Sequence, residues 1–427
     1  MLDPAWLAIA ALVLVVVVSC TSRVNPGLLA LVLAWLLGVC PASLCERPVG
    51  LKVVIGGFPS GLFLTLTGVT LLFALVQDNG TLDRVARRAV RACGGRTGLV
   101  PVLFFALAAA VGTAGAGNIA AAALVAPAAM STARRLGIPA FPMALMVAHG
   151  AIAGGMSPFG PAGVVVAAMC RDRLGLPGAE WAIYAHNFLA NAAVGFAGFA
   201  LFGGLRRHTP LPADAERLAE AGLDATTLSG RHRGTLLVLG LVAAAVVGLG
   251  ADVGMTALAG AVVLIGFRIA DESRAVQAVP WGVILMVCGV STLAAVLEHT
   301  GGTDRLAGML ARVATPATAP ALVALVCGLV SVYSSTTGVV LPAFLPLVPG
   351  LVAHLGGDPL FLASSVVVGG NVADASPLST IGALCLASAC AGEDRRRLFS
   401  RLLAWGLAMP FVAAVGYGLI AAVRGGL

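Results

Sequence analysis

Long apolar segments, separated by short polar loops, run through almost the whole chain of 427 residues. A helix needs about 20 apolar residues to cross a bilayer. By this measure the pattern predicts full or broken membrane spans at 5–22, 26–43, 60–77, 139–170, 181–205, 235–250, 254–268, 280–298, 359–390 and 402–422. The pattern therefore predicts an all-α, polytopic membrane protein.

Two further apolar stretches, 97–133 and 315–352, are too long for a single span. A helix of that length would measure about 55 Å, whereas the hydrocarbon core of a bilayer is about 30 Å thick. Each stretch has a polar or Gly-rich centre, at Gly112–Asn118 and at Ser331–Gly338. We expect each to form two half-length helices that meet at a polar tip and return to the same side, as a re-entrant hairpin.

Two of the spans carry matching interruptions. Gly154–Gly160 reads GGMSPFG, Ala373–Ser379 reads ADASPLS, and an offset of 219 residues relates Pro158 to Pro377. The same offset pairs Gly150 with Gly369, Gly163 with Gly382, Pro127 with Pro346 and Asn118 with Thr337. Two matching halves with helices broken by Gly, Ser and Pro are typical of secondary transporters, which bind substrate at the breaks.

The order of the predicted elements is the same in both halves. Each half has three spans, a short amphipathic segment, a hairpin, a broken span and a last span; the amphipathic segments are Thr81–Ala92 and Thr303–Val313, typical of helices lying on the membrane surface. Five spans per half place the second half in the opposite orientation. We therefore expect two inverted repeats, 1–205 and 235–427, joined by a cytoplasmic linker at 206–234.

Composition and charge restrict the class of protein. With 59% hydrophobic and 11% charged residues, a soluble domain is excluded, and nine scattered Cys without a CxxC pair indicate neither a disulfide framework nor a zinc site. An orientation with both termini outside puts 19 of the 26 Lys and Arg in cytoplasmic loops and seven outside, as the positive-inside rule requires. The net charge of +7 thus reports orientation, with anionic lipid contact as an alternative for the Arg runs at 87–91 and 395–397. No nucleic-acid partner is expected.

The broken helices supply the chemistry of a candidate site. Half-helices that end inside the membrane expose N–H groups whose dipoles favour an anion, and their free carbonyls are ligands for Na⁺. The candidate substrate-binding residues are Asn118, Ser157, Pro158, Ser335, Thr336, Thr337, Ser376 and Pro377. The candidate cation-binding residues are Gly117, Asn118, Gly154, Gly155, Thr337 and Asp374. Packing kinks and local helix caps are the structural alternative for these positions.

Four charged or titratable residues need separate treatment. Asp374 lies in the middle of the 359–390 span, where a carboxylate costs about 2.5 kcal/mol or more. It is either a cation ligand or protonatable coupling group, or a cap of the half-helix that begins near Ser376. For His149 a packed, hydrogen-bonded core residue is the better interpretation, with a functional role as the alternative. Asp78 and Glu298 are best interpreted as solvated helix ends.

The two tips, at Gly117-Asn118-Ile119 and Ser334–Thr337, and the two breaks resemble the ion transporter superfamily, in particular the divalent anion/sodium symporters and the MatC-type dicarboxylate carriers. Asn25–Ala30 also resembles the start of the MatC-type carriers. The resemblance covers nearly the whole chain. It implies a homodimer in the bacterial cytoplasmic (inner) membrane that works by an elevator mechanism. The Ser-Asn-Thr triplet found at both tips of sodium-coupled members is reduced to Asn118 in the first tip, and the second has only hydroxyl residues.

These features predict a secondary active transporter that couples Na⁺ or H⁺ to the uptake of a small dicarboxylate such as malonate, malate or succinate. An anion exporter or a Na⁺/H⁺ antiporter of the same superfamily is the alternative. The only cofactor expected is the coupling ion. A membrane enzyme is disfavoured because the chain has no HExxH or GxSxG motif and no clustered His/Asp pair. A channel remains a further, less favoured, alternative.

Overall fold

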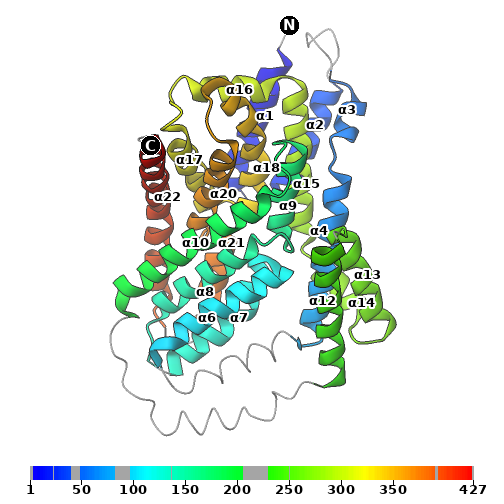
Figure 1. Ribbon diagram of the computed structural model, residues 1–427, viewed down its shortest axis with the longest axis vertical. Helices are drawn as coiled ribbons and strands as arrows, with labels where there is room; N and C mark the ends of the chain where they lie inside the picture. Colours follow the sequence, from blue (N-terminus) through cyan, green and yellow to red (C-terminus); the bar gives the residue numbers. More distant parts are fainter. Residues whose placement is uncertain are drawn as a thin grey trace.

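The computed structural model describes residues 3–22, 24–39, 49–81, 97–135, 137–204, 229–249, 251–389 and 393–425, and all regular elements within them are helices (Figure 1). Six helical stretches in this described part are long and apolar enough to cross a membrane, and six shorter apolar helices accompany them. The protein is therefore an all-α, multi-pass membrane protein, as the sequence predicts.

The helices follow the predicted order in both halves. The first half contains α1 (Pro4–Thr21), α2 (Pro26–Gly38), α3 (Leu51–Gly56), α4 (Ser60–Asp78), α6 (Val100–Val111), α7 (Gly117–Arg135), α8 (Ala140–Gly155), α9 (Pro161–Asp172) and α10 (Ala179–Phe199). The second half contains α12 (Gly230–Leu249), α13 (Val253–Gly266), α14 (Glu272–Ala278), α15 (Trp281–His299), α16 (Gly302–Ala311), α17 (Ala319–Tyr333), α18 (Leu341–Phe344), α19 (Val348–Leu355), α20 (Pro359–Ala373), α21 (Thr380–Ala387) and α22 (Arg395–Gly425).

Of the two predicted surface segments, the second lies within the described residues. The second is present as α16, close to the predicted 303–313. The first, Thr81–Ala92, lies outside the described residues except for Thr81. Most of the predicted linker at 206–234 lies outside them as well.

Two short helices, α3 and α14, were not predicted. Each comes directly before a long span, and each is separated from that span by a proline, Pro59 before α4 and Pro280 before α15. A proline restricts the residue before it and cannot continue a helix, so it ends the preceding segment. The two prolines lie 221 residues apart, which is close to the offset between the broken spans; this is the signal that could have located both short helices.

Helices of the two halves cross at glycines, where their backbones come close together. A Cβ on Gly27 of α2 would lie 2.2 Å from the Leu285 carbonyl oxygen of α15, and one on Gly289 of α15 would lie 2.1 Å from the oxygen of Gly27. In the same way, a Cβ on Gly68 of α4 would lie 2.3 Å from the oxygen of Gly254 in α13. Small residues permit such close backbone contact in membranes. The second span of each half thus packs on the third span of the other half.

We expect Gly254→Ala to lower the melting temperature, because its methyl group would sit 2.4 Å from the Thr65 Cα and force α13 away from α4. Overpacking of this kind costs about 1–3 kcal/mol. Gly266→Ala, at the other end of the same helix, adds its methyl to open space, and should leave the melting temperature unchanged or raise it. Thermal unfolding of the purified variants measures both; equal shifts would contradict the close crossing.

The ion pairs join residues that the predicted topology places on the same side of the membrane. Arg305 pairs with Asp3 (2.6 Å), Arg424 with Asp358 (3.2 Å), and Arg173 with Glu298. All six belong to loops that the sequence assigns to one membrane side. Arg274 and Asp78, assigned to the other side, approach to 3.9 Å. Asp78 and Glu298 therefore lie at helix ends, as predicted, but each has an ionic partner there.

Candidate functional site

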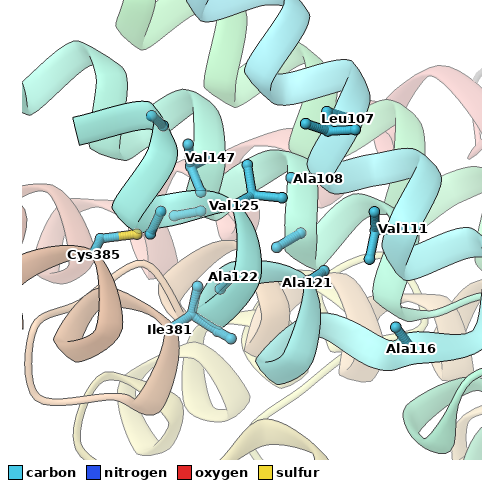
Figure 2. Close-up of a cluster of buried hydrophobic side chains, with 14 of the residues drawn as sticks. Leu107, Ala108, Val111, Ala116, Ala121, Ala122, Val125, Val147, Ile381 and Cys385 are labelled. Atoms are coloured by element: carbon cyan, nitrogen blue, oxygen red, sulfur yellow. The ribbon is translucent and has the colours of Figure 1, made fainter. Parts of the chain in front are cut away.

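The first predicted tip is a chain reversal between α6 and α7. A five-residue π-helical turn, Gly112–Ala116, connects them, and Gly115 and Gly117 have φ angles of 114° and 79°. Glycine adopts these values without the steric cost that other residues meet. Both helices pack on α8, and Figure 2 shows side chains of α6 (Leu107) and α7 (Ala122) in one apolar cluster with α8. Residues 97–133 therefore do not form one uninterrupted helix.

The break between α8 and α9 lies against this reversal. A Cβ on Gly155 would lie 2.6 Å from the Asn118 Cβ, and one on Gly112 would lie 2.9 Å from the Gly155 nitrogen. Ser157 is fully buried, and its Oγ donates a hydrogen bond to the carbonyl oxygen of Thr113 at 2.8 Å. The predicted residues of the first half therefore come together in one cluster: Gly117, Asn118, Gly154, Gly155, Ser157 and Pro158.

The second tip reverses the chain in a different way. Ser334 is extended after α17, and a helical turn over Thr336–Val340 then leads into α18. The Ser335 Oγ accepts a hydrogen bond from the Gly338 N–H at 3.1 Å, which is N-capping. The Thr336 Oγ1 is 2.6 Å from the Ser331 Oγ, on the last turn of α17. The hydroxyls of Ser335 and Thr336 thus hold the turn itself.

Asp374 ends α20 at the second break and is 4% exposed. The Ser379 Oγ donates a hydrogen bond to its carboxylate, and Ser379 is the N-cap residue of α21. The expectation that α21 begins near Ser376 is wrong: Ala373–Ser379 forms a longer turn, and α21 begins at Thr380. Asp374 therefore braces the break through Ser379 instead of capping α21 directly. Ser376, in this turn, is fully buried.

The half-helix after each break packs on the helix that follows the reversal of the other half. Helix α21 packs on α7 and α8, and Figure 2 shows Ile381 and Cys385 in the same cluster as Ala121 and Val125. Helix α9 packs on α18, just after the second reversal. The two breaks are thus parts of one interlocked assembly, although they lie more than 200 residues apart in sequence.

His149 is at the centre of a buried polar network. The Trp405 indole N–H donates to the His149 Nε2 at 2.9 Å, so the imidazole proton is on Nδ1, which donates to the Asn191 Oδ1 at 2.9 Å. Because both ring nitrogens are engaged and the residue is fully buried, the prediction of a packed core histidine is confirmed.

The network continues through residues that the sequence analysis did not identify. The Asn187 amide donates to the carbonyl oxygen of Ile152 at 3.1 Å and accepts from the Asn371 amide at 3.1 Å. The Asn191 amide in turn donates to the Asn187 Oδ1 at 3.1 Å, so the whole network joins α8, α10, α20 and α22. The available signal was the spacing of Asn187 and Asn191, four residues apart and so on one face of an apolar helix.

Three buried oxygens have no hydrogen-bond partner within the described residues: the Oγ of Ser334, the Oγ of Ser291 and the Oδ1 of Asn371. Ser334 lies at the second reversal, and Asn371 is one helical turn before Asp374. An unpaired buried polar atom costs about 1–3 kcal/mol. Two of the three oxygens therefore mark the second break and reversal as a place where a further polar partner would be stabilising.

A cavity of about 960 Å³ reaches the first break. Its wall has residues of both halves, among them Pro158, Phe159, Ser291 and Pro346. Its charged lining residues are Arg171, Asp172, Arg173, Glu180, Asp252 and Glu298. Of the predicted substrate-binding residues, all of which the structure describes, Pro158 lies in this lining. The other seven lie outside it: Asn118, Ser157, Ser335, Thr336, Thr337, Ser376 and Pro377.

Comparison with known proteins agrees with this arrangement. Residues 2–155 match the family model of the dicarboxylate carrier protein MatC N-terminus. The whole chain is similar in structure to the YdaH transporter of Alcanivorax borkumensis, with 16% identity, 98% of each chain covered and a TM-score of 0.60. It is similar to Neisseria gonorrhoeae MtrF, of a class of antimetabolite efflux pumps, with 15% identity, 98% of this chain and 95% of that chain covered and a TM-score of 0.57. No curated protein matches the chain.

At these identities the two structural likenesses show the fold alone. The family match over residues 2–155 agrees with a transport protein rather than an enzyme. The resemblance to the MatC-type dicarboxylate carriers, stated from the sequence, is confirmed through residues 2–155.

Proposed function

We propose that this protein is a secondary active transporter that couples the movement of Na⁺ or H⁺ to the uptake of a small dicarboxylate across a bacterial inner membrane. The observation that carries the proposal is the repeated pairing of a chain reversal with a broken helix, once in each half, with each half-helix packed on the other half. The match of residues 2–155 to a dicarboxylate carrier supports the class of substrate.

The proposed topology has two inverted repeats of five spans, 1–205 and 235–427, with a cytoplasmic linker and both termini outside. The reciprocal packing of α2 on α15 and of α13 on α4 supports the inverted relation, because a twofold axis exchanges equivalent contacts. The reversals at 112–116 and 334–340 support re-entrant hairpins. The charge difference between the two sets of loops supports the orientation.

The anion site in this proposal uses helix ends. The N-termini of α7, α9, α21 and the helical turn at Thr336 all lie at the reversals and breaks, so their N–H groups and dipoles favour a carboxylate. Asn118 and Thr337 are the side chains best placed to add hydrogen bonds, because each lies at a reversal and is slightly exposed, at 8% and 7%. Pro158 and Pro377 have no N–H group, so neither can donate the hydrogen bond that would continue a helix through its break.

The cation site in this proposal lies beside the anion. Asp374 supplies the negative charge in the second half, with the unpaired oxygens of Ser334 and Asn371 nearby in sequence. Backbone carbonyls at Gly117, Gly154, Gly155 and Thr337 are the further candidate ligands, since Na⁺ prefers oxygen and unwound helix segments leave carbonyls free. A cation and a dicarboxylate in one low-dielectric site strengthen each other's binding, which is the physical basis of symport.

The proposed motion is an elevator within a homodimer. The moving body would contain α6–α10 and α17–α22, which pack on one another and share the His149 network. The fixed body would contain α1, α2, α4, α12, α13 and α15, linked by the glycine crossings.

Uptake of labelled malonate, succinate and malate into proteoliposomes tests the function. We expect accumulation of at least one of them under an inward Na⁺ or H⁺ gradient, and little without it; protein-free liposomes are the control. Uptake that ignores every cation gradient would contradict coupling. Cation flux with no organic acid present would favour the alternative, a Na⁺/H⁺ antiporter, for which the buried carboxylate of Asp374 is also suited.

A further inference from the structure

A second cavity, of about 390 Å³, lies between α10, α20 and α22, and its lining shares no residue with the cavity at the first break. Its lining is mainly apolar and includes Leu189, Phe361 and Val412. Gly416 lies in the wall, and a Cβ added there would have no atom within 4 Å. The groove is therefore open at this position, and its volume is within the range of about 300–1,000 Å³ usual for small-molecule sites.

The groove opens toward the membrane. Helices α10 and α22 are the least buried of the long spans in the described part of the chain. Their exposed residues beside the groove are apolar: Leu189 is 65% exposed, and Val412 and Ile420 are also exposed. In a membrane protein such a surface faces lipid chains.

The polar groups inside the groove are bonded to one another. The His186 Nδ1 lies 2.9 Å from the Ser364 Oγ, which lies 3.0 Å from the Tyr417 hydroxyl. Because these bonds use polar atoms that would otherwise require water, the wall can accept a hydrocarbon chain without a large desolvation cost.

The guanidinium group of Arg424 lies at one end of the groove. Arg424 lines it, bonds the Asp358 carboxylate through Nη1 at 3.2 Å, and lies 4.5 Å from the centre of the Phe361 ring. A guanidinium has five N–H donors, so the contact made by Nη1 leaves donors of the same group for a second acceptor. Planar guanidinium groups recognise phosphate well, and Arg424 lies in the last turn of α22, where a spanning helix reaches the headgroup region.

We propose that this groove binds an anionic phospholipid, with one acyl chain along α20 between α10 and α22 and the phosphate at Arg424. Basic pockets between membrane helices bind anionic lipid headgroups by the same electrostatic attraction. The site differs from the proposed transport site in its walls and in its ligand, and its test needs no transport activity.

Native mass spectrometry of the full chain, released from nanodiscs that contain phosphatidylglycerol, tests the proposal. The wild type should retain bound phosphatidylglycerol. Gly416→Leu places its Cβ in open space and its longer side chain in the groove, and should reduce the retained fraction by about tenfold or more. Gly240→Leu, on a helix away from the groove and likewise in open space, is the matched control and should retain lipid as the wild type does.

A second variant separates the headgroup from the chain. Arg424→Gln should lower retention of phosphatidylglycerol and reduce its preference over phosphatidylcholine, with the melting temperature little changed, because the ion pair with Asp358 is about half exposed. Equal lipid retention by Gly416→Leu and the wild type would overturn the proposal. So would a change from dimer to monomer in Gly416→Leu without loss of lipid, since that result would assign the groove to a second copy of the chain.

Discussion

Asp374→Asn is expected to remove the cation dependence of dicarboxylate binding while leaving the protein folded. The side chain is 4% exposed at the second break, and a carboxylate held there is costly unless a cation or proton compensates it. Asparagine keeps the shape and still accepts a hydrogen bond from Ser379, but it carries no charge. We expect the affinity for the coupling cation to fall by about tenfold or more.

Asp358 provides a control at the other end of the same helix. It is the N-cap residue of α20 and is about half exposed, and Asn is an equally good N-cap. Asp358→Asn should therefore bind cation and dicarboxylate as the wild type does. The measurement is the melting temperature as a function of Na⁺ and pH, with and without dicarboxylate, since a ligand of the folded state raises it. Wild-type cation dependence in Asp374→Asn would reduce Asp374 to a brace of the break.

Gly155→Ala is expected to disrupt the part of the site that the first half contributes, and so to reduce dicarboxylate binding and uptake strongly. Its methyl would lie 2.6 Å from the Asn118 Cβ and 2.7 Å from the Asn118 nitrogen, so the reversal between α6 and α7 must move away from the break. Displacement of positioning groups by about 1 Å can cost 10²-fold in rate. We expect a comparable loss of uptake, together with a lower melting temperature from overpacking.

Gly240→Ala is the matched control for this variant, because its methyl enters open space on α12. It should keep wild-type uptake and stability. A Gly155→Ala protein that takes up dicarboxylate at the wild-type rate would show that the contact between the first reversal and the first break does not matter for function.

The sequence predicts the helices well because their signals are local. The lengths of the apolar segments and the Gly-rich or Ser-rich tips locate the spans and both reversals, and the offset between Pro158 and Pro377 locates the breaks. The short helices α3 and α14 were missed since neither is long enough to register as a span. Pro59 and Pro280 are the local features that separate them from the spans that follow.

The partners of the site residues could not be predicted, because they depend on long-range packing. The bond between Trp405 and His149 joins residues 256 positions apart, and the Asn187–Asn371 bond spans 184. Residue type alone also does not say how a hydroxyl is used. Ser157 bonds the first reversal and Thr336 bonds α17, so both support the site's framework, whereas Thr337 keeps a small exposed surface.

An electron cryomicroscopy map tests most directly whether the two breaks and the two reversals form one binding site. The protein would be imaged in nanodiscs with NaCl and a saturating concentration of whichever of malonate, succinate and malate stabilises it most. We predict ligand density that touches both halves, near Asn118 and Pro158 on one side and Thr337 and Asp374 on the other. Density confined to another part of the molecule, or contacts with only one half, would contradict the account.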